Sequence, residues 1–163
     1  MASKDKAKKT NTPEQDGPQT PPLTINAQYI KDLSFEHPNP MDALKPSETQ
    51  PAIDINIDVG ADKVQENTFE VSLTIKADAK RGDDTLFISE IVYAGIFTLG
   101  ENIPKEAVHP VLMIECPRML FPFARSVLAN VTREGGFPPL SLNPIDFAAL
   151  YHQQMETANE KEA

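Results

Sequence analysis

The sequence contains no tryptophan and a single cysteine, Cys116, among its 163 residues. One cysteine excludes an intrachain disulfide, which is usual for a protein kept in a reducing compartment. No apolar run approaches the roughly 18 residues of a membrane-spanning helix, and no apolar core of the kind found in secretory signals follows the N-terminal lysines. We therefore expect a cytoplasmic protein that does not insert directly into membranes.

Basic residues are scarce relative to acidic ones. Lysine and arginine together number 15 and aspartate and glutamate 24, which gives a formal net charge of −9 at pH 7 with histidine neutral. Because phosphate binding requires a clustered basic surface, we expect no nucleic-acid partner. An acidic surface favours solubility and can also steer a basic partner toward the protein.

A recognisable reaction centre is also missing. Cys116 could act as a nucleophile only with a neighbouring base and a lowered pKa, and the three histidines are scattered, at positions 37, 109 and 152. These residues show no metal-ligand spacing, and the glycine-rich phosphate-binding patterns are absent. We therefore predict no enzyme activity, no metal and no cofactor, with Cys116 a buried thiol where a helix begins. The alternative is a small-ligand protein or a cysteine-dependent enzyme on a sheet-and-helix scaffold.

What the chain does contain is regular alternation of apolar and polar residues. Residues 1–22 are polar, contain several prolines and have no period, which predicts a disordered N-terminal tail. Residues 23–152 hold the periodic segments and are expected to form one domain. Residues 153–163 are polar and acidic, and we predict a flexible C-terminal tail there.

Four stretches alternate with a period of two, which is typical of half-buried strands: residues 23–36, 53–59, 69–77 and 86–99. Turn signals between the last three predict an antiparallel meander. A long connection, residues 39–51, follows the first strand. The apolar face of that first strand carries Leu23, Ile25, Ala27, Tyr29, Leu33 and Phe35. Its polar face carries Asn26, Gln28, Asp32, Ser34 and Glu36.

The fourth stretch is apolar on both faces. One face has Phe87, Ser89, Ile91 and Tyr93, and the other has Leu86, Ile88, Glu90 and Val92. The second face is then either covered by another subunit or forms a partner-binding patch around Glu90. If this strand lies next to the first one, Asp32 and Glu36 join Ile88 and Glu90 on one solvent face. Carboxylates around an aliphatic strip suit a basic, partly apolar partner.

Two helices are predicted after the strands. Residues 104–114 have helical spacing, but Pro110 should break or restart this helix. The main helix should begin near Phe121, because proline is tolerated in the first helical turn. It should end at the glycine pair at positions 135 and 136.

The last segment combines an apolar loop with a further helix. The loop at residues 137–142 either closes the core or leaves a groove beside a helix. Asn143 is a candidate N-cap, with Pro144 in the first helical position. The whole order predicts an α+β fold in which a four-stranded antiparallel sheet packs on helices.

Four segments resemble one known family. They are YIKDLSFEHPN at residues 29–39, FISEIVYAGIF at 87–97, ECPRMLFPFAR at 115–125 and GGFPPLSLNPIDFAALY at 135–151. In this order and separation they are similar to SecB, the bacterial protein-export chaperone family, over residues 25–151. Pro110 departs from the family pattern, which is helical at that position.

The resemblance implies a function without catalysis. SecB-like proteins are homotetramers, assembled as a dimer of dimers, which hold unfolded precursor proteins in an export-competent state without ATP and deliver them to the SecA translocation ATPase. A SecB-like chaperone devoted to a non-exported client is the nearest alternative.

The resemblance also implies two sets of site residues. The family binds the basic, zinc-stabilised tail of SecA on an acidic sheet surface, and the zinc belongs to SecA. The matching positions are Asp32, Glu36, Ile88 and Glu90. The family's client groove lies between the crossover connection and the C-terminal helix. The candidates here are Met41, Leu44, Phe137, Leu140, Leu142 and Phe147.

Overall fold

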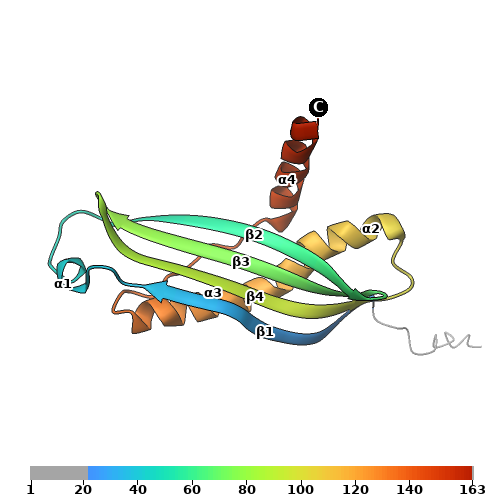
Figure 1. The fold of residues 1–163 in the computed structure, drawn as a ribbon, viewed down its shortest axis with the longest axis horizontal. Coiled ribbons are helices and arrows are strands. Elements are labelled where there is room, and N and C mark those ends of the chain that lie inside the picture. The colour runs from blue at the N-terminus through green and yellow to red at the C-terminus, as the bar shows by residue number, and fades with distance from the viewer. Residues whose placement is uncertain (1–21, 163) are drawn as a thin grey trace, which may run out of the picture.

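The computed structural model describes residues 22–162, so the predicted N-terminal tail lies outside the described residues apart from Pro22. Its main element is a long, curved four-stranded sheet (Figure 1). The strands are β1 (Leu23–Glu36), β2 (Ala52–Gln65), β3 (Thr68–Arg81) and β4 (Asp84–Leu99), in the order β1-β4-β3-β2. All neighbours are antiparallel, which confirms the predicted meander and the α+β class.

Local turn chemistry explains the two hairpins. The β2–β3 turn contains Asn67 with φ 58°, and the β3–β4 turn contains Gly82 with φ 62°. Glycine and asparagine adopt this left-handed backbone more readily than other residues do.

The connection from β1 to β2 is longer and contains the short helix α1 (Pro40–Ala43). Ala43 is the one buried residue of residues 37–51.

The helix predictions need correction. The chain stays helical through α2 (Lys105–Pro110), the π-helical segment η1 (Val111–Glu115) and α3 (Cys116–Glu134). The predicted break at Pro110 and the predicted beginning near Phe121 are therefore wrong.

A π-helical turn accommodates Pro117 within this helical run. A proline inside a regular α-helix removes one N–H and clashes with the carbonyl four residues earlier. In η1 the N–H of Cys116 instead donates to the carbonyl of Val111, five residues back. The turn is wider directly before Pro117, so the helix accommodates the proline without ending.

The last helix, α4 (Phe147–Glu162), begins later than predicted. Its N-cap is Asp146, whose carboxylate accepts a hydrogen bond of 3.0 Å from the N–H of Ala149. The predicted cap at Asn143 with Pro144 in the first turn is therefore wrong. Residues 153–162, expected as a flexible tail, form the exposed second half of this helix, which projects away from the sheet (Figure 1).

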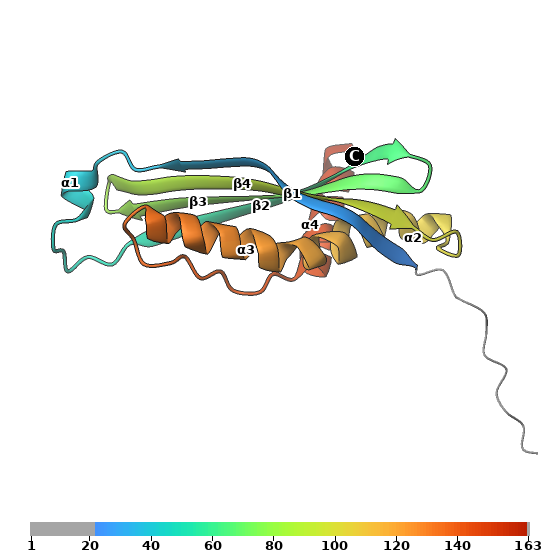
Figure 2. The same cartoon turned by 90° about the horizontal axis from the view of Figure 1, so that it is seen from below.

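Helix α3 runs along one face of the sheet, which we call the inner face (Figure 2). Leu120, Ala124 and Leu128 of α3 are fully buried, as is Ile91 of β4. The predicted burial of one β4 face is confirmed, since Phe87, Ser89, Ile91 and Tyr93 are all buried. Ser89 satisfies its hydroxyl by donating to the carbonyl of Ser34, at 2.9 Å.

Cys116 is a core residue of the α3–sheet contact. The side chain is fully buried, and burial, aided by the neighbouring carboxylate of Glu115, raises the pKa of the thiol to about 12. A nucleophilic cysteine requires the opposite shift, toward a stable thiolate. The cysteine therefore provides packing.

We expect the Cys116 thiol to resist alkylation in the native protein. Iodoacetamide at about pH 8 reacts with thiolate, and the raised pKa and burial leave almost none accessible. Mass spectrometry should find the native chain unmodified and the denatured chain fully labelled, with Cys116→Ser as the blank. Rapid labelling of the native protein would revive the enzyme alternative.

A second prediction concerns the contact between the ends of β1 and α3. A Cβ atom at Gly135 would lie 2.2 Å from Cζ of Phe35. Gly135→Ala must therefore displace the ring, and overpacking of this kind destabilises by about 1–3 kcal/mol in denaturant unfolding. Phe35→Leu in the same chain should recover part of that loss. If the two substitutions are simply additive, the ring does not require the glycine.

Candidate functional site

The pairing of β1 with β4 brings the predicted patch together. Asp32 is opposite Val92, Ser34 is opposite Glu90, and Glu36 is opposite Ile88. Residues directly opposite one another in an antiparallel sheet share a face. The predicted adjacency of the two strands is confirmed, and Asp32, Glu36, Ile88 and Glu90 all lie on the outer face, away from α3. Their role in binding stays a prediction.

The neighbouring strands extend the negative charge across the sheet. On β3, Asp78 is opposite Ile88, and on β2, Asp54 is opposite Asp78 and Asp58 is opposite Thr74. We call the six carboxylates the acidic face: Asp32, Glu36, Asp54, Asp58, Asp78 and Glu90.

The acidic face has little internal compensation. Lys76, opposite Glu90, is the cation among these rows, and no ion pair of the described residues includes any of the six. The sequence analysis missed the three aspartates of β2 and β3. Alternation already set Asp54 and Asp58 on the polar side of β2, but their distance from Glu90 depends on strand order and register.

Strand β1 does not alternate as predicted. Its register against β4 shifts between Ile25 and Ala27 and again between Ile30 and Asp32. Two bulges therefore turn Ala27 and Tyr29 to the outer face, and the prediction that they share a face with Leu33 is wrong.

The outward Tyr29 belongs to a polar network with β3. Its hydroxyl donates to Oε2 of Glu70, and Lys31 Nζ donates to Oε1 at 2.5 Å. Lys31 and then Tyr29 lower the pKa of Glu70, while the hydrogen bond to Glu70 raises the pKa of Tyr29 to about 12. The pKa of Lys31 is raised by the same partner. At neutral pH the network therefore holds an ionised carboxylate between a neutral phenol and an ammonium group.

Several apolar side chains on the inner face of β1 are exposed to solvent. Ile30 is 46% exposed, and its partner Tyr93 stacks on Phe123 of α3, which is 50% exposed, at a centroid distance of 6.1 Å. We call the exposed residues of this region the apolar strip: Ile25, Ile30, Leu33, Met119 and Phe123. It lies on the opposite side of β1 from the acidic face.

The six groove candidates do not form one surface. Met41 and Leu44 in the crossover are 80% and 64% exposed, whereas Leu140, Leu142 and Phe147 are buried. The hydroxyl of Thr132 accepts the N–H of Leu140 at 2.9 Å, which fixes this part of the loop on α3. At Leu140 and Leu142 the apolar loop closes the core, and Phe147 of α4 belongs to the same core.

Phe137 lies between these two groups of candidates. Its ring is half-buried and lies 4.9 Å from Phe87, 6.4 Å from Phe35 and 4.7 Å from His37, measured between centroids. His37 begins the crossover connection, so the aromatic cluster joins the loop to the base of that crossover.

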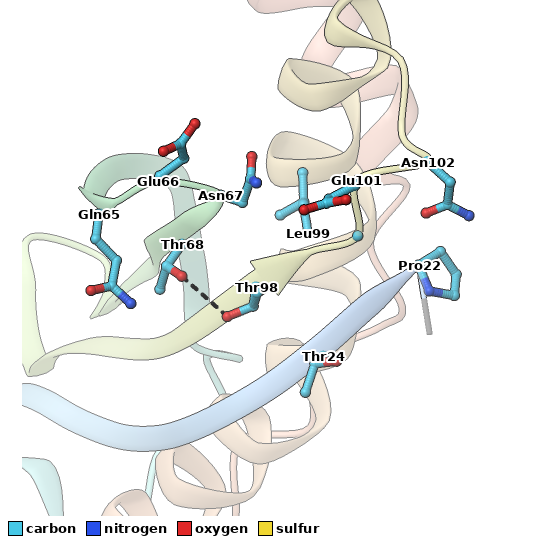
Figure 3. Close-up of a pocket in the computed structure, with 11 residues that line it drawn as sticks. Pro22, Thr24, Gln65, Glu66, Asn67, Thr68, Thr98, Leu99, Glu101 and Asn102 are labelled. Carbon is cyan, nitrogen blue, oxygen red and sulfur yellow. Dashed lines mark hydrogen bonds between the residues drawn. The ribbon is translucent and has the colours of Figure 1, made fainter. Parts of the chain in front are cut away.

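An open cavity of about 1220 Å³ lies at the other end of the sheet (Figure 3). Its lining is as apolar as it is polar, with Thr24, Thr68 and Thr98 beside the β2–β3 turn. None of the predicted site residues lines it. Within residues 22–162, no group of three histidine, cysteine or acidic side chains is arranged to hold a metal, and no helix is long and apolar enough to cross a membrane.

Comparison with known proteins identifies the family. Residues 16–158 match the family described as preprotein translocase subunit SecB. Protein-export protein SecB of Rhodopseudomonas palustris strain HaA2 is 52% identical over 141 residues, covering 86% of this chain and 89% of that protein. The corresponding protein of a Bradyrhizobium strain is 53% identical over 136 residues, covering 83% of each.

A solved structure agrees on the fold. A SecB-like chaperone from Mycobacterium tuberculosis, in complex with a ChAD peptide from the HigA1 antitoxin, superposes with a TM-score of 0.64 at 15% identity. The alignment covers 76% of this chain and 90% of that one. The sequence resemblance is thus confirmed, and the chain belongs to the SecB family.

Proposed function

We propose that the protein is a cytoplasmic, ATP-independent export chaperone that holds unfolded precursor proteins and delivers them to SecA. The observation that carries this proposal is that the two faces of the β1–β4 pair differ in chemistry, in a chain that belongs to the SecB family. The outer side is acidic, with Lys76 as the cation among its rows, and the inner side exposes apolar side chains of β1. Such a chain offers two docking surfaces in place of a reaction centre.

The apolar strip supports assembly of the chain with copies of itself. Ile30, Leu33 and Phe123 are large apolar side chains exposed side by side, and such patches mark interfaces. A second copy would remove them from water and stabilise the assembly by about 25 cal/mol per Å² of apolar surface. We assign the strip to the contacts of a homotetramer, a dimer of dimers as in the family.

Client holding requires accessible apolar groups along a path. Met41, Leu44 and Phe137 meet that requirement, and we assign them to direct client contact. Leu140 and Leu142 anchor the loop in the core, to which Phe147 of α4 also belongs. An extended client gains from many weak contacts at once, and preferential binding of unfolded chains delays their folding by mass action.

The acidic face is the proposed SecA site. Its carboxylates are unpaired within the described residues, so a basic tail would supply the missing cations. Ile88 and Val92 lie among the carboxylates and offer apolar contact between them. The chaperone would therefore present client and SecA on separate surfaces, which permits both to be bound during transfer.

The first test is selective binding of unfolded chains. After size exclusion, light scattering should give a roughly fourfold assembly that co-elutes with a reduced, unfolded polypeptide and not with its folded form. Phe123→Asp should yield smaller species, because a charge replaces an apolar contact in the strip. A monomer that ignores the unfolded chain would sink the proposal.

The second test reverses one charge in the acidic face. Glu90→Lys should abolish SecA binding, measured by calorimetry, and leave assembly and client holding unchanged. Glu101→Lys, the same reversal beyond the other end of β4, is the matched control and should bind SecA normally. Loss of the tetramer in Glu90→Lys would show that the position is structural. Normal SecA binding in that variant would show that the acidic face is not the SecA site, whereas no SecA binding by the native chain would favour a chaperone for a non-exported client.

A further inference from the structure

Two side chains of strand β1, Tyr29 and Lys31, donate to one carboxylate two strands away, that of Glu70 on β3. We use the term phase for the face of the sheet on which each β1 side chain lies. We infer that Glu70 is a positioning residue: by holding Tyr29 and Lys31, it decides which β1 side chains face the basic partner and which face a second copy of the chain. This inference rests on the proposed function, because it concerns the same two surfaces.

Tyr29 and Asp32 share a face although three positions separate them. In a regular strand, an odd spacing places two side chains on opposite faces. Here both face outward because Lys31 is an extra residue with no partner in β4. Without this bulge, an outward Tyr29 would turn Asp32 inward and Leu33 outward, since a slip of one residue reverses every side chain.

Glu70 reaches β1 across an intervening strand. Tyr29 is opposite Ala94 of β4, whereas Glu70 is opposite Ile96 of the same strand. The Tyr29 side chain must therefore cross β4 to meet the carboxylate. Ala94 is 0% exposed although it faces outward, which fits a ring lying above its small methyl group.

Both oxygens of Glu70 hold residues next to the bulge. Tyr29 donates to one and Lys31 to the other, from the two sides of Ile30. Two donors on one acceptor fix the strand both in position and in the orientation of its side chains. The lowered pKa of Glu70 is in keeping with this double engagement.

The other side-chain bonds of β1 within the described residues reach no farther than β4. Asn26 donates to Thr98, and the carbonyl of Ser34 accepts from Ser89. Strand β1 is at the sheet edge, where one neighbour alone specifies the register. The Glu70 network is therefore the part that ties its middle to the body of the sheet.

Cross-linking reports this phase without reference to any partner. In a Cys116→Ser background, the pair Asp32→Cys/Val92→Cys reports the native phase, and Leu33→Cys/Glu90→Cys reports the slipped one, in which Leu33 faces outward opposite Glu90. Glu70→Ala should lower the disulfide yield of the native pair and raise that of the slipped pair. Asp62→Ala, which removes the carboxylate opposite Glu70 on β2, is the matched control. An unchanged ratio of yields in Glu70→Ala overturns the inference.

Binding measurements on single and double variants then distinguish a positioning role of Glu70 from a role in fold stability alone. With the zinc-loaded C-terminal tail peptide of SecA, Asp32→Asn and Glu90→Gln should each weaken binding by about 1.5- to 5-fold, as for exposed charge pairs. In Glu70→Ala the Asp32 effect should disappear and the Glu90 effect should remain. A Glu70 that only stabilises the fold would lower the unfolding midpoint and keep both effects, which contradicts the inference. If neither substitution weakens binding in the native background, the SecA site is refuted, and the cross-linking ratio still decides the role of Glu70.

Discussion

The antiparallel pairing of β1 with β4 is the constraint on which both surfaces depend. It joins the first strand of the domain to the fourth, and within residues 22–162 β4 is the sole strand neighbour of β1. On the outer side the pairing completes the acidic face, and on the inner side it sets Ile30 beside Tyr93 and the exposed ring of Phe123. Any shift of β1 against β4 would therefore alter both surfaces together.

The helical layer is fitted to the length of this sheet. A helix that stopped at Pro110 and began again near Phe121 would leave part of β4 uncovered, whereas η1 lets one helical run continue from Lys105 to Glu134. At its end, Gly135 makes room for Phe35, so the last turn of α3 meets the last residues of β1. The end of α3 is therefore matched to the end of β1.

The sequence predicts those features that local chemistry decides. Strands and hairpins follow from alternation and from turn residues such as Asn67 and Gly82. The wrong predictions concern segments where contacts between residues distant in the sequence override local preferences. Proline rules predicted a broken helix, but burial of Leu120, Ala124 and Leu128 stabilises a continuous one. The bulges of β1 leave no pattern in the strand itself, because the carboxylate that engages Tyr29 comes from β3. The family resemblance supplied the site residues, and the register then supplied their neighbours.

The acidic face is unfavourable for the isolated fold. Asp54 is directly opposite Asp78, and like charges in such a pair destabilise a sheet by roughly 0.2–1 kcal/mol. Asp78 is half-buried, and its Oδ1 is buried without a hydrogen-bond partner, which adds to the cost of placing a carboxylate there. The repulsion also does not vanish on assembly through the apolar strip, which lies on the other side of β1. A basic partner on the outer face removes it, so part of the affinity for such a partner comes from strain already present in the free protein. Charge repulsion thus lowers the stability of the free sheet at the same face that we propose as the docking surface of a basic partner.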